Sequence, residues 1–203
     1  MKPSEKLSVI VATFVLLLPT TQNRAFAQQD QVATEVLTDF SKQNESERWI
    51  TVNDNVMGGR SKGGPKFGDG KLIFAGSTNT NGGGFSSIRT KPQKWDTSKS
   101  EGIIIRVRGD GRTYKADLLT DNKMGRFSIA YRSDFQTKKD EWIEVKVPFD
   151  SFKPTLMGSD MTGRTRQLDR AEIQTVGFMI YDGKDGPFRL EVDWIKTYIK
   201  TDE

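Results

Sequence analysis

A polar segment around Asp54 carries the densest group of side chains that could recognise a ligand. It reads Asn53-Asp-Asn-Val-Met-Gly-Gly-Arg-Ser61 and lies between two β-type runs. We expect Asp54, Arg60 and Ser61 to offer hydrogen-bonding groups to a ligand, or to residues beneath one. The alternative is structural: Asp54 would cap the turn, and Val56 and Met57 would plug one end of the fold. For Val56 and Met57 we favour that structural role, whereas for Asp54 and Arg60 both roles stay open.

A second candidate segment, residues 84–89, follows the glycine run Gly82-Gly83-Gly84. In a strand, side chains alternate between the two faces, so Phe85, Ser87 and Arg89 share one face and Ser86 and Ile88 the other. An aromatic ring, a hydroxyl and a guanidinium in a row could form a platform for a sugar or a peptide. Phe85 could equally be a core residue.

A third set of polar residues begins on the run Gly102-Ile-Ile-Ile-Arg-Val-Arg108. Its apolar face leaves Arg108 pointing outward, just before a turn that contains Asp110 and Arg112. The hypothesis is that these residues, with Arg89 and Tyr114, converge on one outer surface. The commoner alternative is a solvated ladder of charges across a sheet, and burial is the default for a strand aromatic such as Tyr114, Trp142 or Tyr181.

The composition excludes several classes of chemistry. The 203 residues contain no histidine and no cysteine, so catalytic triads, thiol chemistry and the usual zinc ligands are ruled out, and no disulfide can form. The formal net charge of +4 is too balanced to predict nucleic-acid binding. The turn at residues 182–186 could hold calcium, but its spacing misses the EF-hand pattern, so we expect a hairpin turn. The prediction is no metal, no cofactor and no enzymatic activity.

The first residues are typical of a targeting segment. Lys2 and Lys6 precede an apolar run, and Ala25-Phe-Ala27 resembles a signal-peptidase site. The apolar run is shorter than the roughly 20 residues that cross a bilayer, so a cleaved signal is favoured over a permanent anchor. A mitochondrial presequence is disfavoured, because such segments are Arg-rich, amphipathic and poor in acidic residues, whereas this one has Glu5 and an unbroken apolar block. We therefore expect a signal peptide at residues 1–27, a disordered lead-in at 28–35 and one domain at 36–200, exported to the periplasm or secreted as a monomer.

The rest of the chain predicts an all-β fold. Short runs rich in Ile, Val, Phe and Tyr alternate with turn residues about every ten positions, and helical periodicity is nearly absent. Turns are expected at residues 109–111, 121–122 and 182–186, and a short helix at 169–173. The pattern favours a β-sandwich of two antiparallel sheets. The clearest strands are residues 71–75, 84–89, 102–108, 113–119, 127–132, 142–147, 175–181 and 188–197.

Taken in order, these segments resemble the complex I intermediate-associated protein 30 family. The resemblance covers about residues 40–200 and rests on Trp49-Ile-Thr-Val-Asn-Asp-Asn-Val-Met-Gly-Gly-Arg-Ser61, Gly83-Gly-Phe-Ser-Ser-Ile-Arg89 and Arg108-Gly-Asp-Gly-Arg-Thr-Tyr114. It implies a non-enzymatic jelly roll similar to galactose-binding domains and carbohydrate-binding modules. Mitochondrial members imply a role in complex I assembly, and plastid relatives an RNA-associated protein. The expected export argues against a direct transfer of either role.

The leading functional hypothesis is a non-catalytic binding module that engages a protein or glycan partner through a polar surface. The alternatives are a carbohydrate-binding module, a carboxylate-based glycoside hydrolase, and an assembly factor or chaperone for a membrane or envelope complex. The candidate ligand-binding residues are Asp54, Arg60, Ser61, Phe85, Ser87, Arg89, Arg108, Asp110, Arg112 and Tyr114.

Overall fold

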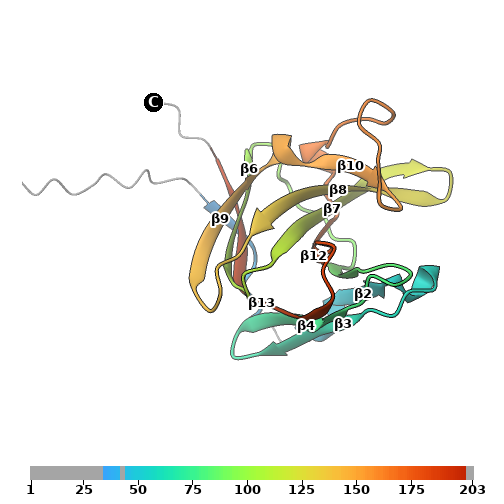
Figure 1. Ribbon diagram of the computed structural model, residues 1–203. Coiled ribbons are helices and arrows are strands. Elements are labelled where there is room, and N and C mark those ends of the chain that lie inside the picture. The colour runs from blue at the N-terminus through green and yellow to red at the C-terminus, as the bar shows by residue number, and fades with distance from the viewer. Residues whose placement is uncertain (1–33, 42–43, 200–203) are drawn as a thin grey trace, which may run out of the picture. The chain divides into compact units, whose positions relative to one another are not determined.

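The computed structural model describes residues 34–41 and 44–199, which fold into a sandwich of two antiparallel sheets (Figure 1). Sheet 1 contains, in spatial order, β3 (Lys62–Gly68), β4 (Lys71–Thr78), β13 (Gly186–Tyr198), β6 (Gly102–Arg108) and β9 (Trp142–Pro148), with β1 (Thr34–Thr38) also pairing with β13. Sheet 2 contains, in spatial order, β11 (Ser159–Asp160), β10 (Lys153–Leu156), β8 (Phe127–Gln136), β7 (Thr113–Met124), β12 (Thr175–Ile180), β5 (Ser86–Thr90) and β2 (Trp49–Asn53).

Helical structure in the described residues is confined to single turns. These are α1 (Glu45–Arg48) and the 3-10 turns η1 (Asp54–Met57), η2 (Phe149–Ser151) and η3 (Arg170–Glu172). The turn η3 confirms the short helix expected at residues 169–173. No helix in this part of the chain is long and apolar enough to cross a membrane.

All eight strands predicted from the sequence are present, and the two-sheet, all-β fold class is confirmed. Prediction missed β2, β3, β10 and β11, and among these the β3 sequence Lys-Gly-Gly-Pro-Lys-Phe-Gly has little β propensity. Pro65 is tolerated there because β3 is the edge strand of sheet 1, where a missing amide donor costs least. The strand β1 begins at Thr34, inside the segment expected to be disordered. The expected signal peptide and the rest of the lead-in lie outside the described residues.

The core lies between the sheets and fixes which side chains face outward. On β6, Ile103, Ile105 and Val107 point inward as expected, and on β7 so do Tyr114 and Leu118. Each strand alternates its side chains, so the intervening residues face the outer surfaces. The central strand β12 is buried along its whole length, so even its outer residues are covered by neighbours.

Two of the expected turns differ from prediction. The turn expected at Asp121-Asn122 does not exist, because β7 continues to Met124 with a shift of register between Leu119 and Lys123. The Asn122 side chain donates hydrogen bonds to the Tyr131 hydroxyl and to Thr165, and this fixes the irregularity inside the strand. The segment 182–186 is not a hairpin turn either, since it connects β12 in sheet 2 with β13 in sheet 1.

Candidate functional site

A groove runs over the outer face of sheet 2, and its floor follows from strand register. In one row, Ser87 of β5 lies opposite Met179 of β12, which lies opposite Lys115 of β7. In the next row, Arg89, Gly177 and Asp117 occupy the same three strands, and the row continues through Arg132 on β8 to Lys153 on β10. Over these strands the floor therefore combines a row of three residues with one apolar side chain, Met179, and an adjacent row in which four of five residues are charged.

One half of the groove, which we name the apolar hollow, has a volume of about 440 Å³. Its rim carries five apolar side chains that are unusually exposed for their size, with exposed fractions between 40% and 68%. They come from four separate segments of the chain, so the fold has gathered them at one place. These five residues are Val56, Met57, Phe127, Met157 and Tyr181.

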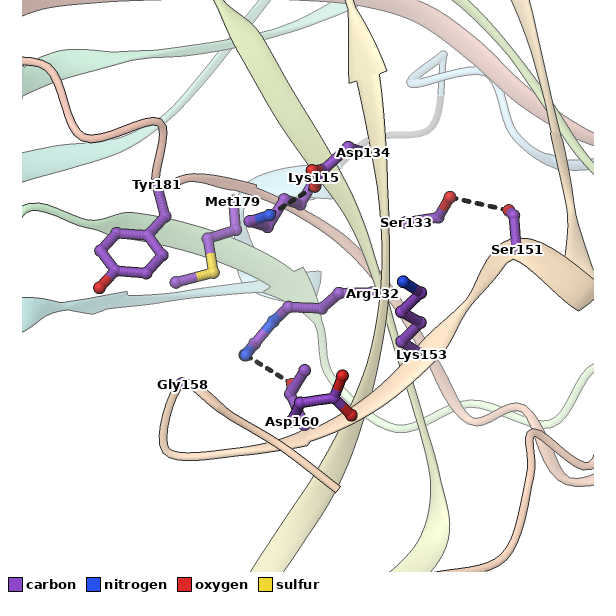
Figure 2. Close-up of a pocket in the computed structure, with 11 residues that line it drawn as sticks. Lys115, Arg132, Ser133, Asp134, Ser151, Lys153, Gly158, Asp160, Met179 and Tyr181 are labelled. Atoms are coloured by element: carbon purple, nitrogen blue, oxygen red, sulfur yellow. Dashed lines mark hydrogen bonds and ion pairs between the residues drawn. The ribbon is translucent and has the colours of Figure 1, made fainter. Parts of the chain in front are cut away.

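The other half, the polar hollow, has a volume of about 350 Å³ and shares Arg132, Gly158, Met179 and Tyr181 with the apolar hollow. Figure 2 shows the Arg132 side chain extending from β8, with Met179 on one side of it and Lys153 on the other. The remaining charged residues that line it are Lys115, Asp134 and Asp160.

Most charges of the polar hollow are already paired. Lys115 forms an ion pair with Asp134. Arg132 donates from Nε to the buried Asp117 at 3.0 Å and from Nη1 to the Thr155 hydroxyl at 2.8 Å. Asp134 and Asp117 are thus held by cations, whereas Asp160 accepts a hydrogen bond from the Thr162 amide. This arrangement favours a fixed polar surface over a pair of carboxylates poised for acid–base chemistry.

The Asp54 carboxylate fixes the rim of the apolar hollow from beneath. It is fully buried and accepts hydrogen bonds from the Ser61 amide at 2.8 Å, the Ser61 hydroxyl at 2.6 Å, and the amides of Gly84 and Phe85 at 2.7 and 3.3 Å. Burial alone would raise the pKa of Asp54, but these donors outweigh it and hold the pKa below its usual value. The carboxylate thereby ties the loop with Val56 and Met57 to the start of β5.

Three of the residues predicted to bind a ligand line the groove together. Ser87 and Arg89 lie on the outer face of β5, Phe85 immediately precedes that strand, and all three border the apolar hollow, as alternation predicted. Phe85 also contacts Tyr181 edge-to-face, with ring centroids 6.4 Å apart. Asp54 and Ser61 lie beneath the rim, and Arg60 is exposed next to them without lining either hollow.

The expected convergence on one surface is wrong, because Arg108 belongs to the other sheet. On β6 it pairs with Glu191 at 2.7 Å and lies over the Trp142 ring. Strand alternation specifies the face of a strand but not the sheet to which the strand belongs. Arg89 and Arg108 therefore point away from opposite faces of the sandwich.

Asp110, Arg112 and Tyr114 form a separate network where the chain crosses between the sheets. Arg112 makes a bidentate pair with Asp182, at 2.5 and 2.9 Å, and also donates to the carbonyls of Lys184 and Pro187. The Tyr114 hydroxyl, buried in the core, donates to Asp110 at 3.0 Å. Burial and the charge of Asp110 raise the pKa of Tyr114. These contacts explain all three residues structurally, away from the groove.

Sequence reasoning missed much of the groove. Tyr181 was expected to be buried and is 46% exposed. Lys115 and Arg132 could have been found, because each stands between two inward-facing residues of its strand. Met157 and Phe127 flank glycine-containing turns, and no local pattern shows that those turns rise beside sheet 2.

Comparison with known proteins identifies the family to which the sequence is similar. A family model for complex I intermediate-associated protein 30 matches residues 38–192. The mitochondrial complex I intermediate-associated protein 30 of Mus musculus is 26% identical over 195 residues, covering 80% of this chain and 56% of the relative. The Drosophila melanogaster protein of the same name is 26% identical over 187 residues, which cover 80% of this chain and 62% of the relative. The chain thus spans little more than half the length of these relatives.

The solved structures show the same jelly-roll architecture. A family 11 carbohydrate-binding module from Clostridium thermocellum, in complex with a β-1,3-1,4-mixed-linked tetrasaccharide, superposes with a TM-score of 0.61. The match covers 85% of this chain and 99% of the module, at 20% sequence identity. At that identity the likeness establishes the fold and leaves the ligand open.

The relatives also correct the expected location. They are named as mitochondrial proteins, which contradicts a periplasmic or secreted location and points to mitochondria instead. The apolar run and the two lysines before it were interpreted from composition alone, and such a stretch does not by itself distinguish between targeting routes.

Proposed function

Since the chain belongs to the complex I intermediate-associated protein 30 family, we propose that its β-sandwich is a non-catalytic domain that holds a protein partner in the groove of sheet 2. The relatives are named for their association with intermediates of complex I, so the partner class we propose is a subunit of a respiratory complex during assembly. Because the chain covers only part of those relatives, this role concerns the domain and not the whole of a longer protein.

One observation carries the proposal: five exposed apolar side chains surround a single hollow. Exposed apolar surface that is concentrated around a concavity is typical of sites that bind other proteins. Two of the five are Met57 and Met157, and Met179 lies in the floor. Methionine is flexible and polarisable, so it adapts to the shape of an apolar protein segment.

The test is binding to individual complex I subunits, measured by biolayer interferometry with the full chain. Met157→Glu places a charge on the rim and should weaken binding at least about tenfold, because burying an unpaired carboxylate is costly. Val36→Glu is the matched control, since Val36 is 51% exposed on sheet 1 and should not affect binding. Equal binding by all three proteins would overturn the proposed site.

A glycan is the second candidate ligand, favoured by Tyr181 and Phe85 beside Arg89. Aromatic faces stack on sugar rings, and a guanidinium can bind sugar hydroxyls. Of these two rings only Tyr181 is substantially exposed, however, and Phe85 meets it edge-to-face, so the pair forms no flat platform. Affinity electrophoresis in a β-1,3-1,4-mixed-linked glucan checks this: we expect no retardation, whereas retardation that Tyr181→Ala removes would favour the glycan.

A further inference from the structure

Arg89 is a half-buried cation in the groove floor that lacks a counter-charge among the described residues. Its Nε is shielded from solvent and has no hydrogen-bond partner among the residues that the structure describes, and within the same set it forms no ion pair. An unpaired buried donor on a charged group is costly. We propose that Arg89 anchors a carboxylate of the bound protein segment, an inference that rests on the proposed function.

The neighbouring residues leave Arg89 available for this role. Gly177, opposite Arg89 on β12, has no side chain, and a Cβ atom there would come within 2.7 Å of the Cβ of Arg89. On the far side of Gly177, Asp117 is engaged by Arg132. Among the described residues of the row, the one carboxylate gives its Oδ1 to another guanidinium, and its buried Oδ2 forms no ion pair with Arg89. Arg89 therefore keeps its charge for a group that comes from outside.

The charge of the lining favours an acidic partner. Four cations line the two hollows, Arg89, Lys115, Arg132 and Lys153, against two carboxylates, Asp134 and Asp160. Asp117 lies beneath Arg132 and offsets one more charge. A positive excess in a concave site attracts an acidic segment and raises its association rate.

The surroundings of Arg89 also specify what stands next to the carboxylate. In the adjacent row Val52, Ser87 and Met179 lie side by side across β2, β5 and β12, and all three border the apolar hollow. A segment that places a carboxylate on Arg89 thus brings its neighbouring side chains into apolar surroundings. The occupant is a protein segment in which an aspartate or glutamate stands between apolar residues.

Selection from a phage-displayed library of random 12-residue peptides tests this with a defined probe. The wild-type chain should enrich peptides in which an acidic residue is flanked by apolar ones. Arg89→Gln should weaken binding of a selected peptide about tenfold or more, and replacing the acidic residue of that peptide by its amide should have no further effect on the variant. Arg106→Gln, which removes an arginine from sheet 1, is the control and should bind normally.

The outcomes separate this inference from the function on which it rests. The role of Arg89 alone would be overturned by peptides whose binding is weakened by Met157→Glu but which contain no acidic residue. Selected peptides that bind Arg89→Gln as tightly as wild type would overturn it as well. Failure to enrich any peptide, or binding that Met157→Glu leaves unchanged, would overturn the protein-binding groove itself. Arg89→Lys keeps the positive charge but loses the planar guanidinium that can bind both carboxylate oxygens. Its affinity should therefore lie between those of Arg89→Gln and the wild type. Circular dichroism of each variant confirms that it is folded.

Discussion

The Ser61 hydroxyl donates a hydrogen bond of 2.6 Å to the Asp54 carboxylate, although six residues, two of them glycines, separate the two in sequence. The same carboxylate accepts from the Gly84 amide, 30 residues further along the chain. This single buried group thus joins the loop that carries Val56 and Met57 to the strand that carries Phe85, Ser87 and Arg89. The shape of the apolar hollow depends on it.

Replacing Asp54 with asparagine should destabilise the fold. The amide nitrogen of asparagine cannot accept a hydrogen bond, so at least one buried donor loses its partner, at a cost of about 1–3 kcal/mol in the free energy of unfolding. Urea denaturation measures this. Asp69→Asn is the control, because Asp69 is exposed in a tight turn with φ of 52°, a conformation that asparagine tolerates well. A stability loss as large in the control would contradict the role assigned to Asp54.

Stability should fall in acid because several carboxylates have lowered pKa values when folded. Burial opposes the charge of Asp54, Asp182 and Glu191, but hydrogen bonds and arginine neighbours outweigh it and lower each pKa. A group whose pKa is lowered by folding stabilises the protein above its unfolded pKa, about 3.9 for Asp and 4.3 for Glu, and loses that contribution as the pH falls through its folded pKa.

The free energy of unfolding, measured between pH 7 and pH 3, should therefore stay level down to about pH 5 and decline below about pH 4. Asp54→Asn should show a weaker decline, since one of the three groups no longer titrates. An identical pH dependence in the variant and the wild type would show that Asp54 does not contribute.

Gly83 should not tolerate a side chain. A Cβ atom there would lie 2.5 Å from an Asp54 oxygen and 2.6 Å from the Asp54 Cβ. Gly83→Ala should displace the rim, cost about 1–3 kcal/mol of stability and weaken binding in the apolar hollow. Gly68→Ala is matched to it, because a Cβ at Gly68 meets nothing within 4 Å, and its stability should change by less than about 1 kcal/mol. Similar losses in both variants would argue against the close approach.

Arg112 should matter for stability and not for binding. It is 11% exposed and its partner Asp182 is 7% exposed, so removing the guanidinium leaves a buried carboxylate unpaired, at a cost of about 3–5 kcal/mol. Arg166→Ala breaks an exposed pair with Asp121 and should cost less than about 1 kcal/mol. Thermal unfolding compares the two. Loss of peptide binding by folded Arg112→Ala would instead favour the recognition role that the sequence suggested.

The positions of most strands and the faces of their side chains were predictable from the sequence, whereas only some of the residues that line the groove were. Alternation identified the inward face of β6 and the shared outer face of Phe85, Ser87 and Arg89, because period two is a local property. Arg108 was misplaced because the assignment of a strand to a sheet depends on long-range pairing. Met157 and Tyr181 were missed because the rim is built from segments that are distant in sequence, and their placement depends on tertiary packing.

Site-specific photo-crosslinking measures most directly where a partner binds. The full chain, carrying a photoreactive benzoylphenylalanine at position 157 or at position 144, is irradiated with isolated complex I subunits. Met157 lies on the groove rim, and Glu144 is exposed on β9 of sheet 1. We predict a covalent adduct with a subunit from position 157 and none from position 144. An adduct only from position 144, or none from either, would contradict a protein-binding groove on sheet 2.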